Sequence, residues 1–223
     1  MTTSDAVLRR VRGALGLGRL LPLGGPADAA WLSESAAAAV LRRAVASVPS
    51  AALNDIRLSL ADPEAAEPPT VPMPPAALWP GPLRIDAGVS VWDLTEPIPA
   101  LTAALRAALF DAAAEELGLT VTVVDLRVDA LLDAAPEERA APGAPAAVEP
   151  SEPVGTAAAA TVGVAHLTGT LGAAVHHAPD HVRVELATAE GHRALDVARA
   201  VRRVVAGVLE EDRAVTVVIT ATA

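Results

Sequence analysis

The sequence predicts an α+β fold made of two small related domains of α-β-β-α-β type, each a small sheet packed against helices. The main observation is a pattern that occurs twice. A helical stretch runs into a polar break and then into a β-rich segment, at 119–128 and again at 214–220. At an offset of 96 residues the two occurrences match in apolar positions and also place Arg106 on Arg202. A recurring unit of this length is typical of duplicated domains. The matched apolar pairs are Leu105 and Val201, Leu109 and Val205, Val121 and Val217, and Val123 and Ile219.

Composition divides the chain into four segments. Residues 1–30 form a basic N-terminal tail, residues 31–133 the first domain, and residues 154–223 the second, shortened domain. Between the domains, residues 134–153 hold five prolines together with several glutamates. A segment of this composition is expected to be a flexible linker. The sequence therefore predicts two domains that fold separately.

The tail carries Arg9, Arg10 and Arg12 among apolar residues, a pattern that suits a short basic amphipathic helix weakened by glycines. Two interpretations stay open: a segment that docks on a membrane surface or a partner, or a frayed terminus with solvated charges. No long apolar region follows the arginines, so we expect no secretory signal. No apolar run approaches the roughly 18 residues of a membrane span.

The first domain opens with a predicted helix over 31–48, where apolar residues recur at helical spacing until Pro49 stops them. Residues 56–60 alternate between apolar and polar, as in a half-buried strand. Residues 62–82 are rich in proline and predict a long loop. Residues 83–91 alternate again and predict a second strand.

A second helix is predicted to start at the Thr-Glu-Pro sequence of 95–97 and to end near Gly118, a natural helix-terminating residue. The strand that follows, 119–128, changes its apolar phase between Val123 and Val124. Such a change indicates either a β-bulge or a strand that is covered on both faces. The first domain is therefore predicted to have the order α-β-β-α-β.

The second domain predicts a shortened form of the same order. Residues 157–164 suggest a short helix, and residues 182–186 alternate as a strand. Gly191 precedes a helix with a valine-rich face, and residues 214–220 form the closing strand.

Composition limits the function classes. The chain is 52% apolar, but mostly through Ala, Val and Leu, so burial has to come from many aliphatic contacts. The net charge is −10, which disfavours a general nucleic-acid surface because phosphate binding needs a basic footprint. The absence of cysteine excludes disulfides, thiolate zinc sites and cysteine nucleophiles.

Two weak chemical signals have simpler explanations. His177 and His181 are spaced for metal binding on a helix, but Pro179 lies between them, so solvated loop histidines are favoured. Gly169 and Gly172 match the Gly-x-x-Gly loop of KH domains, which clamps nucleic-acid backbone. This loop carries no basic residue, so a simple turn is favoured. We predict no catalytic residue, no metal site and no cofactor.

Short strings in both halves resemble the alkaline shock protein family of bacterial envelope stress response proteins. The resemblance covers most of 31–133 and 154–220. In the first half it is carried by Leu32-Ser-Glu-Ser, by Glu96-Pro-Ile-Pro and by the closing turn and strand Glu116–Val128. In the second half it is carried by Val162–Gly172, His181–Leu186 and Ala194–Val205.

This resemblance implies a non-enzymatic scaffold or adaptor of the envelope stress response, in the form of two tandem copies. Family members are soluble proteins that self-associate and are held at the membrane by a small integral membrane partner. The implied partners are that anchor protein and paralogues of the same family, and the implied location is cytoplasmic or peripheral at the inner face of the membrane. The alternative is a KH-like nucleic-acid-binding module.

The sequence also suggests where self-association occurs. A small sheet covered by two helices leaves at least one edge open. We expect Val124 and Leu126 to project from the outer face of the closing strand and to form a contact with another domain or another copy. Together with Arg9, Arg10 and Arg12, they are the predicted interaction residues. A Val124→Lys substitution is then expected to weaken the contact and leave the fold intact.

Overall fold

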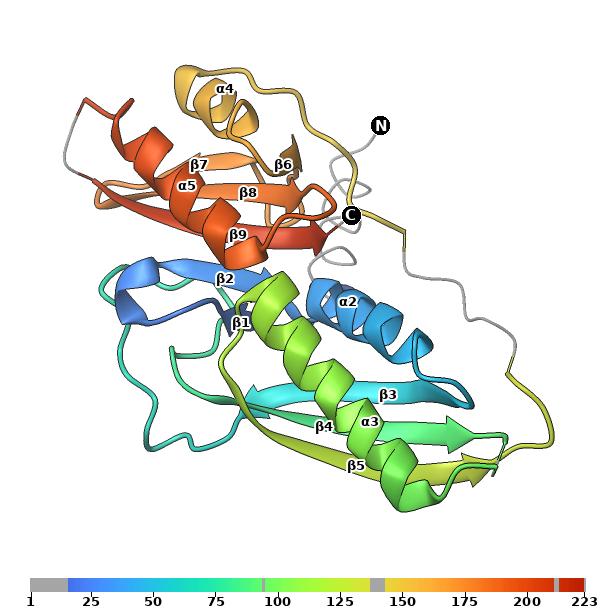
Figure 1. Ribbon diagram of the computed structural model, residues 1–223. Helices are drawn as coiled ribbons and strands as arrows, with labels where there is room; N and C mark the ends of the chain where they lie inside the picture. Colours follow the sequence, from blue (N-terminus) through green and yellow to red (C-terminus); the bar gives the residue numbers. More distant parts are fainter. Residues whose placement is uncertain (1–15, 94, 137–142, 211–212, 223) are drawn as a thin grey trace, which may run out of the picture.

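The computed structural model describes residues 16–93, 95–136, 143–210 and 213–222. They form two α+β units that lie against each other, one with a three-stranded sheet and one with a six-stranded sheet (Figure 1). The predicted α+β class is confirmed. Helix α2 (Glu34–Ala46) contacts strands of both sheets, which places it between the units.

The first unit has the predicted order α-β-β-α-β. Strand β4 is central, pairing antiparallel with β3 and parallel with β5. Helix α3 continues directly into a π-helical turn, η2, which ends at Gly118 in the left-handed conformation with φ +83°. The elements are α2, β3 (Ala51–Leu60), β4 (Leu83–Val91), α3 (Ile98–Asp111), η2 (Ala112–Leu117) and β5 (Val121–Leu131).

The second unit repeats this arrangement. Strand β8 is central, pairing antiparallel with β6 and parallel with β9, and the short strand β7 also pairs with β8. Its elements are α4 (Pro153–Ala159), β6 (Val164–Leu167), β7 (Val175–His177), β8 (His181–Thr188), α5 (Ala194–Ala206) and β9 (Ala214–Thr222). The two units are therefore related in topology, as the repeated pattern predicted.

The N-terminal part of the chain differs from the prediction. Strands β1 (Leu20–Pro22) and β2 (Ala30–Ser33), joined through the 3-10 helix η1 (Pro26–Asp28), extend the sheet of the second unit, where β2 runs parallel to β9. Residue Trp31, expected to begin the first helix, lies in this strand. The helix begins at Glu34 because the Ser33 hydroxyl accepts a hydrogen bond from the Ala36 N–H at 3.2 Å, a standard N-cap.

One hydrophobic core runs through both units. It joins the inner faces of the sheets to the apolar faces of the helices, without a break at the boundary between units. The helix positions matched by the repeat are buried in both copies, as Leu105 and Val201 show. Each buried aliphatic side chain contributes roughly 1.5–3 kcal/mol, so this shared core binds the two units together.

A bulge explains the phase change in β5. Val121 pairs with Leu83 and Val123 with Arg84, which leaves Thr122 as the extra residue. A second register shift follows Val128. Of the two predicted alternatives, a β-bulge or a strand covered on both faces, the structure has the bulge, but its effect on side-chain direction was not foreseen.

The bulge reverses the expected direction of two predicted interaction residues. Val124 lies opposite Ile85 and faces the core, with 6% of its surface exposed, and Leu126 packs against the same core. The placement of their side chains on the outer face was therefore wrong. The residues that project outward between the two register shifts are Val123, Asp125 and Arg127.

The proline-rich segment 61–82 has no helix or strand, as predicted, but it packs on the outer face of the second unit's sheet. The indole Nε1 of Trp31 donates to the Leu78 carbonyl at 3.1 Å, and Leu20 exchanges backbone hydrogen bonds with the same stretch. Val71 and Met73 pack against the small apolar cluster around Trp31. This face of the second unit is thus covered by a segment from the first.

Candidate functional site

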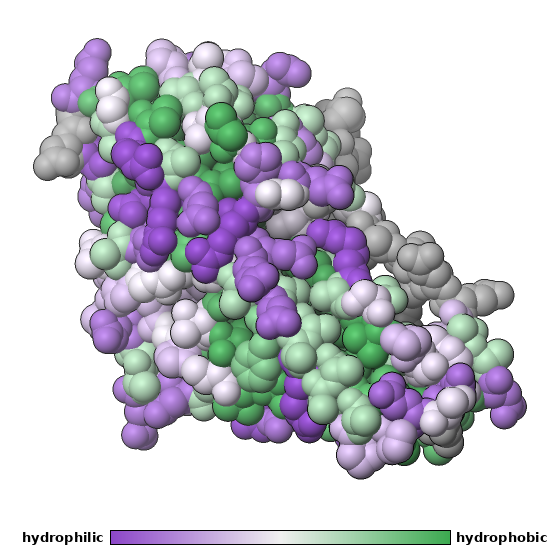
Figure 2. Space-filling view, in the orientation of Figure 1, coloured by the Kyte–Doolittle hydropathy of each residue, from purple (hydrophilic) through white to green (hydrophobic). Residues whose placement is uncertain are grey.

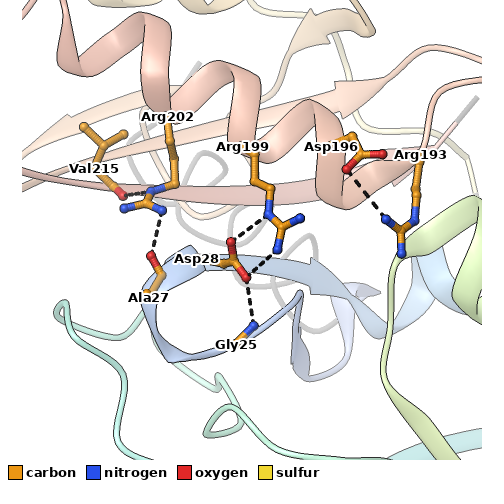
Figure 3. A network of polar contacts seen from close by, with 8 residues as sticks. All are labelled: Gly25, Ala27, Asp28, Arg193, Asp196, Arg199, Arg202 and Val215. Carbon is orange, nitrogen blue, oxygen red and sulfur yellow. Dashed lines mark hydrogen bonds and ion pairs between the residues drawn. The ribbon is translucent and has the colours of Figure 1, made fainter.

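A network of polar contacts lies where α5 meets the connection between β1 and β2 (Figure 3). Arg199 binds the Asp28 carboxylate through Nε at 2.8 Å and Nη2 at 3.0 Å. Arg202 donates from Nε to the Val215 carbonyl at 3.0 Å and from Nη1 to the Ala27 carbonyl at 2.8 Å. We call Asp28, Arg199 and Arg202 the arginine junction.

The electrostatics of the arginine junction indicate a structural role. The hydrogen bond from Arg199 holds the pKa of the Asp28 carboxyl below its usual range, and the Gly25 N–H adds to the effect. Burial lowers the pKa of Arg202. Nearby, Arg193 donates to the Ala114 carbonyl at 2.9 Å in η2. These guanidinium groups bind segments of their own chain and hold them together. Figure 2 shows hydrophilic side chains gathered over the boundary between the two units.

A second polar contact joins the two sheets. The Glu34 carboxylate accepts the Leu58 N–H of β3 at 3.0 Å and both the N–H and Nη2 of Arg19 at 3.3 Å. Arg19 also donates to the Leu58 carbonyl. Burial alone would raise the pKa of Glu34, but these donors outweigh it and the pKa lies below its usual value. The pair therefore caps the edge of β3 and ties it to the segment that leads into β1.

The Gly-x-x-Gly loop lies between β6 and β7, on the outer face of the second sheet. The N–H of Leu171 donates to the Glu185 carboxylate at 2.9 Å, and Arg183 donates to the other carboxylate oxygen at 3.1 Å. Glu185 is fully buried, and burial raises its pKa. The loop thus binds a carboxylate of its own chain, an arrangement unlike a loop that clamps phosphates with free amides and cations.

The histidines make simple pairs. His177 in β7 lies 2.7 Å from the Glu152 carboxylate, and His181 at the start of β8 lies 2.8 Å from Asp180. They therefore occupy adjacent strands instead of one helical face. Among the described residues, no group of three or more histidine or carboxylate side chains is arranged to hold a metal ion.

The outer face of the first sheet carries ordered charges. Arg84 pairs with Asp86 at 3.1 Å and also contacts Asp125. Arg127 pairs with Asp129 at 2.5 Å, and this hydrogen bond holds the pKa of Asp129 below its usual range. We call this set the charge ladder. Its members are partly or largely exposed, so the face is open to solvent.

The outer edge of β5 is another open surface of the first unit among the described residues. Within the described ranges, β5 pairs with β4 and with no other strand, whereas its counterpart β9 is flanked by both β8 and β2. Arg106 Nε donates to the Val124 carbonyl at 3.3 Å, just as Arg202 donates to Val215. Val124 and Val215 are thus equivalent positions of the two closing strands. The sequence offset between these strands is smaller than that between the helices, because η2 lengthens the first unit before its closing strand.

The predicted interaction residues have different outcomes. Arg9, Arg10 and Arg12 lie outside the described residues. Val124 and Leu126 have side chains in the core, but the strand to which they belong forms the open edge. The arginine junction and the Glu34 contact were not foreseen. In the sequence, the arginine junction was indicated only by the match of Arg106 with Arg202. A charged residue that recurs at matched positions needs a partner in both copies.

Comparison with known proteins adds no relative. No family model matches the chain, no curated protein matches it, and no solved structure matches it. A separate property concerns membranes: in the described part of the chain, no helix combines the length and apolar character needed to cross one.

Proposed function

We propose that this protein is a non-enzymatic scaffold or adaptor that binds other proteins through its first unit. The observation that carries the proposal is the asymmetry of the repeat. The two units share one topology, but in the described part of the chain the surfaces that are covered in the second unit are open in the first.

The second unit is closed by segments of the same chain. Strand β2 occupies the outer edge of β9, while the segment 61–82 and the loop at 168–174 cover the outer face of the sheet. The corresponding edge of β5 has no strand beside it within the described residues, and the corresponding face bears the exposed charge ladder. An open strand edge is a template for pairing with another chain.

The resemblance to the alkaline shock protein family supplies the biological setting of the proposal. In that setting the protein acts in the bacterial envelope stress response. It is held at the inner face of the cell membrane by a small integral membrane protein, and it associates with paralogues or with copies of itself. The bound carboxylate in the Gly-x-x-Gly loop gives the KH-like alternative no support.

Site-specific photo-crosslinking in the native cell tests this function. A crosslinking residue at Asp125, on the outer face of the first sheet, is expected to capture an integral membrane protein or an alkaline-shock-like protein. The matched control is Glu64, which is also exposed but lies in the segment that covers the second unit. Capture at Glu64 and none at Asp125 would contradict the proposal. Salt-dependent retention on RNA or DNA would favour the KH-like alternative instead.

A further inference from the structure

We propose that the open edge of β5 pairs with β5 of a second copy of this chain. The two strands run antiparallel and are centred on Leu126, so that the two three-stranded sheets become one continuous sheet. This inference deepens the proposed function, because it assigns one partner and one register to the open edge.

Backbone groups at this edge are directed outward. The N–H of Leu83 donates to the Thr120 carbonyl at 2.7 Å, and the carbonyl of Val91 accepts from the Leu132 N–H at 2.7 Å. Alternate residues of β4, beginning at Leu83 and ending at Val91, therefore bond to β5. In a parallel ladder, the residues opposite them turn their own N–H and C=O groups to the other side. Those residues of β5 are Val124, Leu126 and Val128.

The sequence of this edge is complementary to itself. Residues 124–128 read Val-Asp-Leu-Arg-Val and lie between the two register shifts, where the strand is regular. In an antiparallel pair centred on Leu126, each Asp125 lies opposite Arg127 of the other copy. Val124 then lies opposite Val128, and Leu126 opposite itself. Opposite charges and apolar pairs placed directly across two strands stabilise a sheet.

The second unit shows how the same edge is used when it is filled. In the equivalent strand β9, the Val217 N–H donates to the Ala29 carbonyl at 3.0 Å, on the side where β2 lies. Arg202 binds the β9 edge at Val215 and reaches the incoming chain at Ala27. Arg106 binds the β5 edge at Val124 in the same way, so it is placed to donate to an incoming strand.

Apolar side chains along β5 are partly exposed in the single copy, as expected if a second copy covers them in the dimer. Leu126 and Val128 are only partly buried in the single copy, and Leu131 at the end of the strand is 60% exposed. One added strand covers less than the surface of a standard stable interface. We therefore expect a weak dimer, with a dissociation constant of roughly 10–100 μM.

Sedimentation velocity of the full chain over a concentration series tests the dimer. Arg127→Asp places two aspartates opposite each other at two positions in each dimer, so we expect about tenfold weaker association. The matched control is Arg57→Asp, an exposed position on the opposite edge strand β3, which should leave association unchanged. Thermal unfolding of both variants verifies that they remain folded. A wild type that stays monomeric at several hundred micromolar, or equal loss in both variants, would overturn the proposal.

Disulfide trapping tests the register without relying on a charge reversal. The chain has no cysteine, so single cysteines report only the designed contact. Residues 125 and 127 form a non-hydrogen-bonded pair across the dimer, with Cα atoms about 4.5 Å apart, within disulfide reach. A mixture of Asp125→Cys and Arg127→Cys proteins is therefore expected to oxidise mainly to the mixed dimer. Each variant alone should remain largely unlinked.

Failure of this dimer can be distinguished from failure of the first unit to bind other proteins. Equal linking of Asp125→Cys to itself would show another register and overturn the inference. A monomer that dimerises only after deletion of residues 1–15 would assign the edge to that segment of the same chain, which also overturns it. In either case the crosslinking at Asp125 in cells still tests whether the first unit binds other proteins.

Discussion

Replacing Glu34 by alanine tests how strongly the two sheets depend on one carboxylate. The side chain is 14% exposed and accepts three hydrogen bonds, from Leu58 and from two groups of Arg19. Its loss leaves the Leu58 N–H without an acceptor, which costs about 1–3 kcal/mol. The partly exposed ion pair with Arg19 adds up to about 1 kcal/mol. We expect Glu34→Ala to lower the free energy of unfolding by roughly 1–4 kcal/mol.

Urea denaturation at neutral pH measures this change. Glu34→Gln keeps an acceptor oxygen and loses the charge, so it should cost less, about 1 kcal/mol. Glu64→Ala, at an exposed position of the segment 61–82, is the control and should have little effect. A change below about 0.5 kcal/mol for Glu34→Ala, comparable to a neutral surface substitution, would show that this carboxylate does not hold the two sheets together.

The effect of Glu34 on the free energy of unfolding is expected to depend on pH in a definite direction. The folded pKa of Glu34 lies below its ordinary value of 4.5. Its contribution to stability is therefore complete above the unfolded pKa and is lost as the pH falls through the folded pKa. The stability difference between wild type and Glu34→Gln should be constant near neutral pH and should shrink on acidification below about pH 4.5. A difference that grows in acid would contradict the assigned hydrogen bonds.

Three further predictions follow from the packing. Asp28→Asn should lower the free energy of unfolding by about 1 kcal/mol, because it weakens a partly exposed contact between Asp28 and Arg199. Urea denaturation measures this change, and an unchanged free energy of unfolding would argue against the arginine junction. Val124→Lys should destabilise the fold by about 3 kcal/mol or more because it buries a charge, whereas Val123→Lys on the outer face should not. Circular dichroism on heating compares the melting temperatures of the two variants. Equal melting temperatures would contradict the register of β5. Proteolytic cleavage within 134–153 should leave two fragments that co-elute on size exclusion, because β2 stays paired with β9; separate elution would show independent domains.

The parts of the fold that could be predicted are those with local signals. The alternation of apolar and polar residues in β4 and the helical spacing in α3 reflect the side-chain period of each element, which a short stretch of sequence displays, and both were predicted correctly. The duplication was visible because Leu105 and Leu109 recur as Val201 and Val205. The phase change at Val123 announced a bulge, but not the direction of the side chains after it. A slip of one residue in a strand exchanges its two faces, so Val124 and Leu126 were placed on the wrong side.

The remaining features depend on contacts distant in sequence. Strand β2 has only four residues, and all are buried, so it lacks the alternation that marks a strand. Its partner β9 lies at the other end of the chain, and no local pattern links the two. Trp31 was assigned to a helix because the apolar stripe of α2 follows closely. The sequence of the segment 61–82 predicts a loop. Where this loop packs is determined by the apolar outer face of the second sheet, which no local pattern in the segment indicates.

Amide hydrogen exchange at single residues tests the asymmetry of the two units most directly. The Val217 N–H is bonded to Ala29 across the filled edge of β9, so it should exchange slowly at every protein concentration. The equivalent Leu126 N–H at the open edge of β5 should exchange rapidly in dilute solution. It should become protected as the concentration rises and a second copy pairs with it. Slow exchange of the Leu126 N–H in the dilute monomer, matching that of Val217, would contradict an open edge at β5.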